Sequence, residues 1–181
     1  MQIIPPLKTT HGRSTQRIDG YTLCVHPFIE GTDGFNRDLA DDQWIQLGKT
    51  LKQIHEMDVP LSIQKEIRRE HYSPKWREFV RSLYSRIDAE PVGDPVALKL
   101  LKFMREHILE IRRLVDRAEQ LGQELQGQSP PFVLCHSDIH GGNVLLKGDN
   151  TIYVVDWDDP IMAPKERDLM FIGGGGCECL E

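Results

Sequence analysis

The sequence has no long apolar run, and its cysteines are few and scattered among 181 residues. No stretch approaches the ~20 apolar residues that a membrane-spanning helix needs, and the first residues show no secretory signal. The cysteines at positions 24, 135, 177 and 179 form no CxxC pair, which argues against a zinc site or a disulfide framework. We therefore expect a cytoplasmic protein with no membrane partner.

Positive charge is also scarce, because 22 Lys and Arg residues face 28 Asp and Glu residues, giving a net charge of −6. A nucleic-acid partner would call for a basic surface, so we expect none. The charge is compatible with a small cationic substrate. The hydrophobic fraction of 39% is typical of a globular domain with its own core.

Periodic apolar residues predict three helices in the middle of the chain. Their apolar positions recur every three or four residues, which places them on one face of each helix. The expected helices cover residues 41–57, 74–87 and 97–126. Asp41 and Ser73 are the expected N-caps of the first two. The third pattern could also be a coiled-coil seam, but its wide apolar stripe favours a packed helix.

Strand-forming stretches flank these helices. Residues 20–25 follow an Asp-Gly turn signal, and residues 132–135 form a short apolar run. Near the C-terminal end, residues 143–146 and 151–155 flank Lys147–Asn150, which has the composition of a turn. We expect these two stretches to pair as an antiparallel hairpin.

The expected hairpin brings three oxygen-bearing side chains together. Asn143 begins one strand and Asp156 ends the other, so antiparallel pairing places both at the same open end. The loop that carries Asp138 enters that end. Amide and carboxylate oxygens are suited to Mg²⁺, and a carboxylate held off the metal can accept a proton from a hydroxyl. This combination is typical of phosphoryl transfer.

The spacing His136-x-Asp138-x-x-x-x-Asn143 resembles the catalytic loop of protein-kinase-like enzymes. The strand ending in Asp156-Trp-Asp-Asp and the segment Pro164–Leu169 resemble the aminoglycoside phosphotransferase family, which also includes choline and homoserine kinases. Within that family, the resemblance is closest to the spectinomycin-phosphotransferase-like branch. It implies an ATP-dependent phosphotransferase, with ATP or GTP as donor, that acts on a hydroxyl of an aminoglycoside-like or aminocyclitol-like substrate and confers antibiotic resistance.

The same resemblance assigns roles to individual residues. Asp138 would be the catalytic base, and Asn143 and Asp156 would bind Mg²⁺. His136 and Asp168 would be structural supports of the loop.

The resemblance also implies an α+β, protein-kinase-like fold. Residues 1–34 would be a remnant of the small-lobe sheet with the hinge, and residues 35–172 would be the helical large lobe with the catalytic hairpin. Residues 173–181 would be a flexible tail. Phe28 and Ile29 would lie in the hinge and contact the nucleotide.

Two alternatives remain open from the sequence. Members of the family carry a phosphate loop and a lysine before the segment that begins at Met1, and further helices after Asp168, so we expect a chain truncated at both ends. Such a chain could be a catalytically incomplete fragment that self-associates through exposed core or binds a partner. His136, Asp138 and His140 could instead form a transition-metal site of a metallohydrolase.

Overall fold

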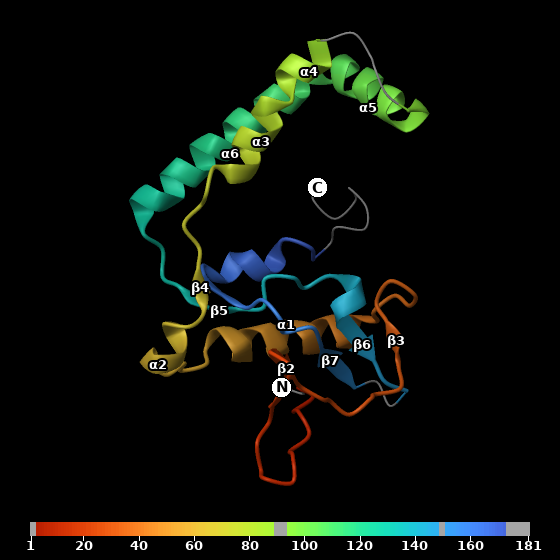
Figure 1. The fold of residues 1–181 in the computed structure, drawn as a ribbon, viewed down its shortest axis with the longest axis vertical. Helices are drawn as coiled ribbons and strands as arrows, with labels where there is room; N and C mark the ends of the chain where they lie inside the picture. Colours follow the sequence, from red (N-terminus) through yellow and green to blue (C-terminus); the bar gives the residue numbers. More distant parts are fainter. Residues whose placement is uncertain (1–2, 89–93, 149–150, 173–181) are drawn as a thin grey trace. The chain divides into compact units, whose positions relative to one another are not determined.

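The computed structural model describes residues 3–88, 94–148 and 151–172, which form helices and short sheets (Figure 1). The chain divides into two compact units. The first comprises residues 1–69 and 131–181, and the second comprises residues 70–130. The first unit contains every strand that the structure describes, and the second is helical.

The predicted hairpin is confirmed in the first unit. Strands β6 (Val144–Leu146) and β7 (Ile152–Val154) pair antiparallel, with Val144 opposite Val154. Strand β3 (Thr32–Asp33) adds to the other side of β6, so the sheet order is β3-β6-β7. The β-branched residues that face the interior suit a pleated, half-buried surface.

A second sheet carries the segments on either side of this hairpin. Strand β5 (Val133–Cys135) confirms the strand expected at residues 132–135 and pairs antiparallel with β8 (Ile161–Ala163). The two-residue strand β4 (Arg68–Arg69) runs parallel to β8 on its other side. This sheet therefore fixes the entry to the loop that holds Asp138 and the exit from the loop after Asp156.

A small hairpin lies near the N-terminus. Strands β1 (Gln16–Ile18) and β2 (Tyr21–Leu23) pair antiparallel. Asp19 and Gly20 connect them with φ values of 49° and 84°, the double positive φ of a type I′ turn. The strand expected at residues 20–25 is therefore present in its first half.

Helix α1 (Asp41–His55) confirms the first predicted helix, but its cap differs from the expectation. Ala40 is the N-cap residue, and its backbone N–H donates to the Gln43 side chain at 2.9 Å. Asp41 is the first helical residue, where its charge favours the positive end of the helix dipole. A four-residue helix, α2 (Leu61–Gln64), follows.

The main core of the first unit lies between α1 and the β6–β7 hairpin. The apolar face of α1 supplies side chains at a helical spacing, and the strands supply alternate residues. The buried cluster comprises Leu47, Leu51, Ile54, Ile139, Val144, Leu146, Ile152 and Val154. Because Ile139 belongs to this cluster, the loop around Asp138 is anchored by its own apolar residue.

Within residues 70–88 and 94–130, the described part of the second unit, there are four helices where the sequence predicted two. They are α3 (Lys75–Ser82), α4 (Tyr84–Asp88), α5 (Pro95–Glu106) and α6 (Ile108–Gln128). The break at Leu83 follows a tightened turn, in which its N–H bonds to the Val80 carbonyl at 3.1 Å. The break at His107 occurs at a φ of −110° and ψ of 14°, outside the helical range. The apolar spacing continues through both breaks, so periodicity alone could not reveal them.

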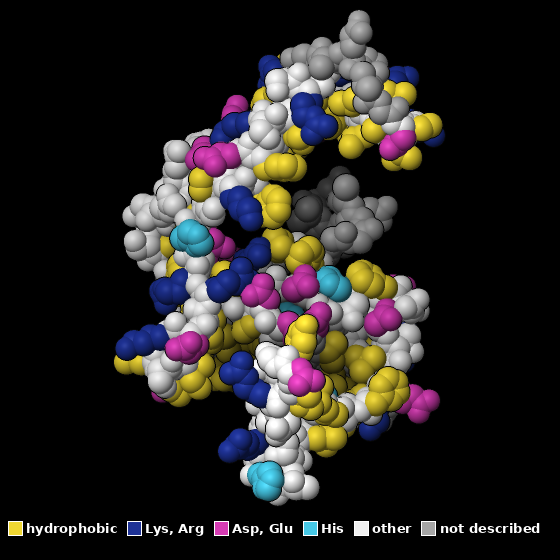
Figure 2. All heavy atoms as spheres, viewed as in Figure 1, with side chains coloured by type: hydrophobic (Ala, Val, Ile, Leu, Met, Phe, Trp, Pro, Cys, Tyr) yellow, Lys and Arg dark blue, Asp and Glu magenta, His cyan; other side chains and the backbone are white. Residues whose placement is uncertain are grey.

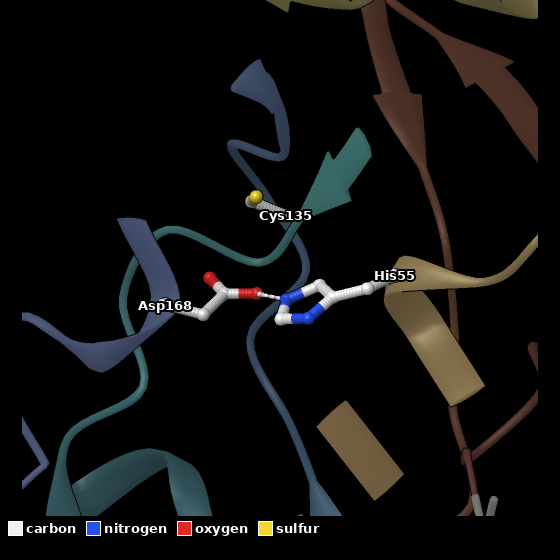
Figure 3. A group of neighbouring side chains, drawn as sticks. All are labelled: His55, Cys135 and Asp168. Carbon is white, nitrogen blue, oxygen red and sulfur yellow. Dashed lines mark hydrogen bonds and ion pairs between the residues drawn. The ribbon is translucent and has the colours of Figure 1, made fainter. Parts of the chain in front are cut away.

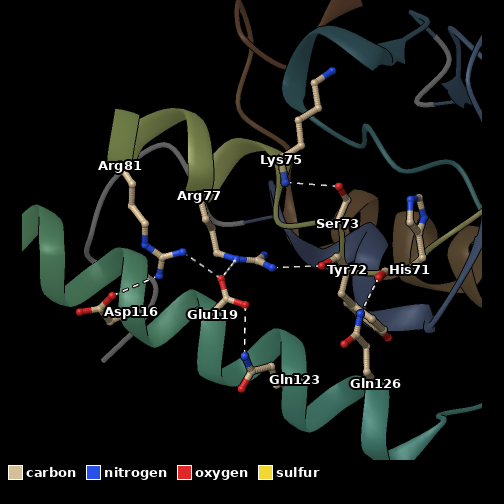
Figure 4. Close-up of polar contacts among 10 residues, drawn as sticks. All are labelled: His71, Tyr72, Ser73, Lys75, Arg77, Arg81, Asp116, Glu119, Gln123 and Gln126. Carbon is tan, nitrogen blue, oxygen red and sulfur yellow. Dashed lines mark hydrogen bonds and ion pairs between the residues drawn. The ribbon is translucent and has the colours of Figure 1, made fainter. Parts of the chain in front are cut away.

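Polar contacts hold α3 against α6 (Figure 4). Arg77 Nε and Arg81 Nη1 donate to one oxygen of Glu119 at 2.9 and 3.1 Å, and Arg81 Nη2 pairs with Asp116 at 3.2 Å. Hydrogen bonds from Arg77, and then from Arg81, lower the pKa of the Glu119 carboxyl. Gly122 of α6 lies beside this cluster, and a Cβ there would be 3.6 Å from Arg77 Nη2, in ordinary van der Waals contact.

Apolar side chains also appear on the surface of the second unit (Figure 2). Trp76, Phe103, Leu109 and Leu114 are each more than half exposed, although the periodic pattern predicted packed positions for their helices.

No helix among the described residues is long and apolar enough to cross a membrane. The predicted boundary at residue 34 stays a prediction, and the predicted tail at residues 173–181 lies outside the described residues.

Candidate functional site

The loop after β5 positions Asp138 beside the start of the hairpin. It runs through residues 136–140 into a short 3-10 helix, Gly141–Asn143, which leads directly into β6. Ser137 adopts a φ of 72°, which few non-glycine residues do. The Asp138 side chain is 49% exposed, so its carboxylate is accessible to a reacting group.

The structure brings Asn143 and Asp138 into contact. Asn143 Nδ2 donates to the Asp138 backbone carbonyl at 3.0 Å and reaches Asp138 Oδ2 at 3.3 Å. The Val155 N–H donates to the Asn143 carbonyl at 3.0 Å, which extends the β6–β7 ladder by one step. Asp156 follows immediately, so it lies at the same end of the hairpin as Asn143, as the sequence predicted.

Two side chains at this end have oxygens that can bind a cation. Asn143 uses its amide nitrogen for Asp138, and its Oδ1 accepts no hydrogen bond from residues 3–88, 94–148 or 151–172. Asp156 is exposed, and its carboxylate has no hydrogen bond or ion pair within the same ranges. Its φ of 64° is uncommon for a non-glycine residue. An amide and a carboxylate oxygen with water around them fit the ligand preference of Mg²⁺.

His136 ties the loop to the strand that precedes Asp156. Its Nε2 donates to the Val155 carbonyl at 2.8 Å, since a carbonyl can only accept. The ring meets Trp157 edge-on, with centroids 4.6 Å apart. Its Nδ1 is buried without a hydrogen-bond partner in the described part of the chain.

Asp168 binds the backbone amides of the loop that carries Asp138. It is 1% exposed, and it accepts from the Ser137 N–H at 2.6 Å and the His136 N–H at 3.2 Å. His55 Nε2, at the end of α1, lies 2.8 Å from Asp168 Oδ2 (Figure 3). A buried carboxylate that receives several donors is well satisfied and orients them.

His55, Cys135 and Asp168 form the one His/Cys/Asp/Glu group with metal-ligand spacing that the described residues contain, with ligand atoms within 4.8 Å of one another. Burial raises the pKa of the Cys135 thiol to about 12, and the nearby charge of Asp168 adds to that rise. The thiol bonds to the carbonyls of Ala163 and Pro164 at 3.7 and 3.5 Å, and the dashed line in Figure 3 joins only His55 and Asp168. A neutral thiol binds metal poorly, so this cluster is a hydrogen-bonded support.

The alternative metal site of His136, Asp138 and His140 is wrong, because the structure does not gather their ligand atoms into one group. His136 Nε2 is used by Val155, and His140 Nδ1 accepts from the Gly142 N–H at 3.0 Å. His140 is therefore a loop hydrogen-bonder.

Two aromatic side chains contact the His140 ring. Phe35 stacks on it with centroids 5.3 Å apart, and Phe171 meets it edge-on at 5.9 Å. Because Nδ1 accepts from Gly142, the neutral ring carries its proton on Nε2, which lies 3.6 Å from Asp138 Oδ2. This N–H therefore faces the Asp138 carboxylate.

Two further residues connect the loops on either side of the site. The Ser137 hydroxyl donates to the Asp159 carbonyl at 3.2 Å. The Asp159 carboxylate pairs with Arg68 Nη2 at 2.6 Å, although both side chains are largely exposed. The loop after Asp156 is thus tied to the loop before Asp138 and to strand β4.

Phe28 and Ile29 lie on the segment between β2 and β3. Phe28 is 91% exposed, and Ile29 is partly buried. The following residue pair, Glu30 and Gly31, approaches the hairpin closely, since a Cβ on Gly31 would lie 2.7 Å from the Leu146 carbonyl oxygen. Contact of Phe28 and Ile29 with a nucleotide stays a prediction.

Sequence reasoning gave no role to His55, Phe35 or Phe171. A signal existed for His55, because it lies four residues after Leu51 and therefore on the buried face of α1. A histidine on such a face needs a hydrogen-bond partner. Nothing in the sequence indicated the two phenylalanines, which reach His140 from positions 105 and 31 residues away.

Residues 2–172 match the sequence model described as the phosphotransferase enzyme family. Among solved structures, the chain is similar to spectinomycin phosphotransferase in complex with ADP and spectinomycin, with 47% identity, a TM-score of 0.87, and coverage of 96% of this chain and 53% of that one. The AMP-bound complex of spectinomycin phosphotransferase gives 47% identity and a TM-score of 0.86, over 96% of this chain and 55% of that one.

A more distant similarity shows the fold alone. An aminoglycoside phosphotransferase from Alicyclobacillus acidocaldarius is 19% identical with a TM-score of 0.60, covering 93% of this chain and 51% of that one. The predicted α+β, protein-kinase-like fold is confirmed. The chain spans about half the length of the solved relatives that it matches.

Proposed function

Since the chain belongs to the phosphotransferase enzyme family, we propose that it carries the catalytic site of an ATP-dependent kinase that phosphorylates a hydroxyl of an aminocyclitol-like molecule. The similarity to spectinomycin phosphotransferase, solved with ADP and with its antibiotic, supports both the donor class and the substrate class. Phosphorylation of such an antibiotic would confer resistance. The net charge of −6 suits a cationic substrate.

The observation that carries this proposal is the geometry of Asp138. Asn143 Nδ2 and His140 Nε2 both face its Oδ2, at 3.3 and 3.6 Å. The hydrogen bond from Asn143 orients the carboxylate, with the His140 N–H nearby, and leaves Oδ1 as the oxygen that receives the proton of the attacking hydroxyl. Asp138 is accordingly assigned as the base.

Asn143 Oδ1 and Asp156 are assigned as the ligands of Mg²⁺. When bound, Mg²⁺ would neutralise charge on the phosphates of the donor nucleotide. The supports keep the ligands in place: His136 bonds the backbone just before Asp156, and Asp168 bonds the backbone just before Asp138. Phe28 and Ile29 are assigned to the adenine-contacting segment.

This proposal is favoured over the catalytically incomplete fragment. The similarity to spectinomycin phosphotransferase, at 47% identity over 96% of this chain and 53% of that one, supports this preference, as does the contact between Asn143 and Asp138. Calorimetry with Mg-ATP separates the two ideas. Binding of Mg-ATP by this chain that requires Mg²⁺ supports the kinase, and the absence of binding favours the incomplete fragment.

The test is Asp138→Asn in this protein, with ADP release measured in the presence of spectinomycin. We expect kcat to fall by about 10²–10⁴-fold, because the hydroxyl loses its proton acceptor. Asp38→Asn is the matched control, since Asp38 is an exposed carboxylate on the segment after β3. Wild-type turnover by Asp138→Asn would refute the assignment.

A further inference from the structure

A thiol and an imidazole lie side by side just after β2, apart from the site described above. Cys24 Sγ is 3.3 Å from His26 Nε2, and both residues are exposed. Residues two apart in an extended segment project from the same side, which explains why the two side chains meet. The thiol S–H can also donate to the Ser14 carbonyl on the facing segment, where the sulfur–oxygen distance is 3.6 Å.

A backbone carbonyl fixes which nitrogen of His26 faces the thiol. His26 Nδ1 lies 2.9 Å from the Ile4 carbonyl oxygen. Because a carbonyl can only accept, Nδ1 carries the ring proton, and Nε2 of the neutral ring presents its lone pair to Cys24. The Leu7 N–H donates to the Val25 carbonyl at 2.7 Å, which holds this N-terminal segment alongside the pair.

This arrangement has the three parts of an activated nucleophile: a thiol, a base within hydrogen-bond reach, and a group that orients the base. Cys135 offers the opposite environment in the same unit. It is 0% exposed and its thiol bonds only to backbone carbonyls, so it has neither a base nor access to solvent. The two thiols therefore differ in both activation and access.

We propose that Cys24 is a modification site, at which His26 activates the thiol for exchange with small disulfides such as glutathione disulfide. The Cys24 S–H proton passes to His26 Nε2 as the sulfur attacks one sulfur of the disulfide. A new S–S bond joins Cys24 to one half of the reagent, the original S–S bond breaks, and the departing thiolate takes the proton from His26. Cys24 is oxidised to a mixed disulfide, and the released half is reduced to a thiol.

The modification would fall four residues before Phe28, on the segment assigned to the nucleotide. The exchange itself involves no phosphoryl transfer. The proposal therefore stands or fails independently of the proposed function.

The experiment measures the rate at which each cysteine reacts with 5,5′-dithiobis(2-nitrobenzoate) and with glutathione disulfide. Cys177→Ser and Cys179→Ser are combined in the background, so that Cys24 and Cys135 are the remaining thiols, and peptide mass mapping identifies the modified one. We expect Cys24 to react and Cys135 to react only after denaturation. His26→Asn should slow the Cys24 reaction roughly tenfold or more, because it removes the base.

His11→Asn is the matched control, since His11 is an exposed histidine in the turn before β1. It should leave the rate unchanged. His26→Gln is the second variant if His26→Asn disturbs the hairpin, as judged by circular dichroism. A Cys24 rate that is the same in the folded His26 variants as in the wild type would overturn the proposal, and so would faster reaction at Cys135.

Discussion

Replacing Asp168 tests whether one buried carboxylate organises the site. Asp168 accepts from two backbone amides, those of His136 and Ser137, and contacts His55 at 2.8 Å. Asp168→Ala removes all three interactions at once. Because Asp168 is 1% exposed, water has poor access to the hydrogen-bond donors that would lose this acceptor.

The expected loss follows from the number of donors left without an acceptor. Each buried unsatisfied donor costs about 1–3 kcal/mol, and removing one member of a buried charged group costs about 3–5 kcal/mol. The three donors share one carboxylate, so their contributions do not add fully. We expect the free energy of unfolding to fall by about 3–5 kcal/mol, a large part of the ~5–15 kcal/mol of a typical domain.

Chemical denaturation followed by circular dichroism measures this loss, and the melting temperature should fall by roughly 10 °C. Asp168→Asn should lose less, because the amide keeps one acceptor oxygen for the Ser137 N–H. Glu166→Ala is the control, since Glu166 is an exposed carboxylate in the same short helix. If Asp168→Ala and Glu166→Ala are equally stable, the carboxylate does not hold the loop.

Three further changes probe other parts of the two units. Gly141→Ala should lower the free energy of unfolding by about 1–3 kcal/mol, because an added Cβ would lie 2.9 Å from the backbone of the facing loop, whereas Gly48→Ala on open α1 surface should not destabilise; urea unfolding compares the two. Hydrogen bonds from two arginines lower the pKa of the Glu119 carboxyl, so its contribution to stability is present above its ordinary pKa of 4.5 and is lost as pH falls through the lowered value. Glu119→Gln has no carboxyl to protonate, so its stability should depend less on pH in this range. Melting curves recorded at acid pH would show the difference. His140→Phe keeps the aromatic stack but removes the N–H that faces Asp138, so kcat should fall about tenfold with the KM for ATP unchanged, while His140→Gln should keep most of the activity.

The hairpin was predictable because its signals are local. Turn-forming residue types between two apolar stretches predict the pairing, and antiparallel pairing places Asn143 and Asp156 at one end. The loop spacing of Asp138 and Asn143 is equally local. These features need only residues near one another in sequence, and the structure confirms the antiparallel pairing, with Leu146 opposite Ile152.

The supports were not predictable in the same way. The His55–Asp168 contact spans 113 residues and depends on where α1 packs. The same is true of β4, a two-residue strand too short to show any alternation, which pairs with β8 across the sequence. The helix breaks at Leu83 and His107 were not predicted for another reason. The apolar residues keep the same spacing across both breaks, so the sequence pattern does not show them.

The supporting residues and the reactive residues of this site differ in how deeply they are buried. Asp168 and His136 are almost fully buried and bond to backbone groups, whereas Asp138 and Asp156 are accessible to solvent. A carboxylate that fixes a loop gains from a water-poor setting, because its hydrogen bonds strengthen there. A carboxylate that meets a cation or a hydroxyl must be reached from outside. Ser137 and Asp156 have a left-handed backbone conformation. They lie where the chain passes from the buried supporting residues to the residues that solvent can reach. Strain of this kind persists only when the surroundings hold it, and the amide bonds to Asp168 supply that hold beside Asp138.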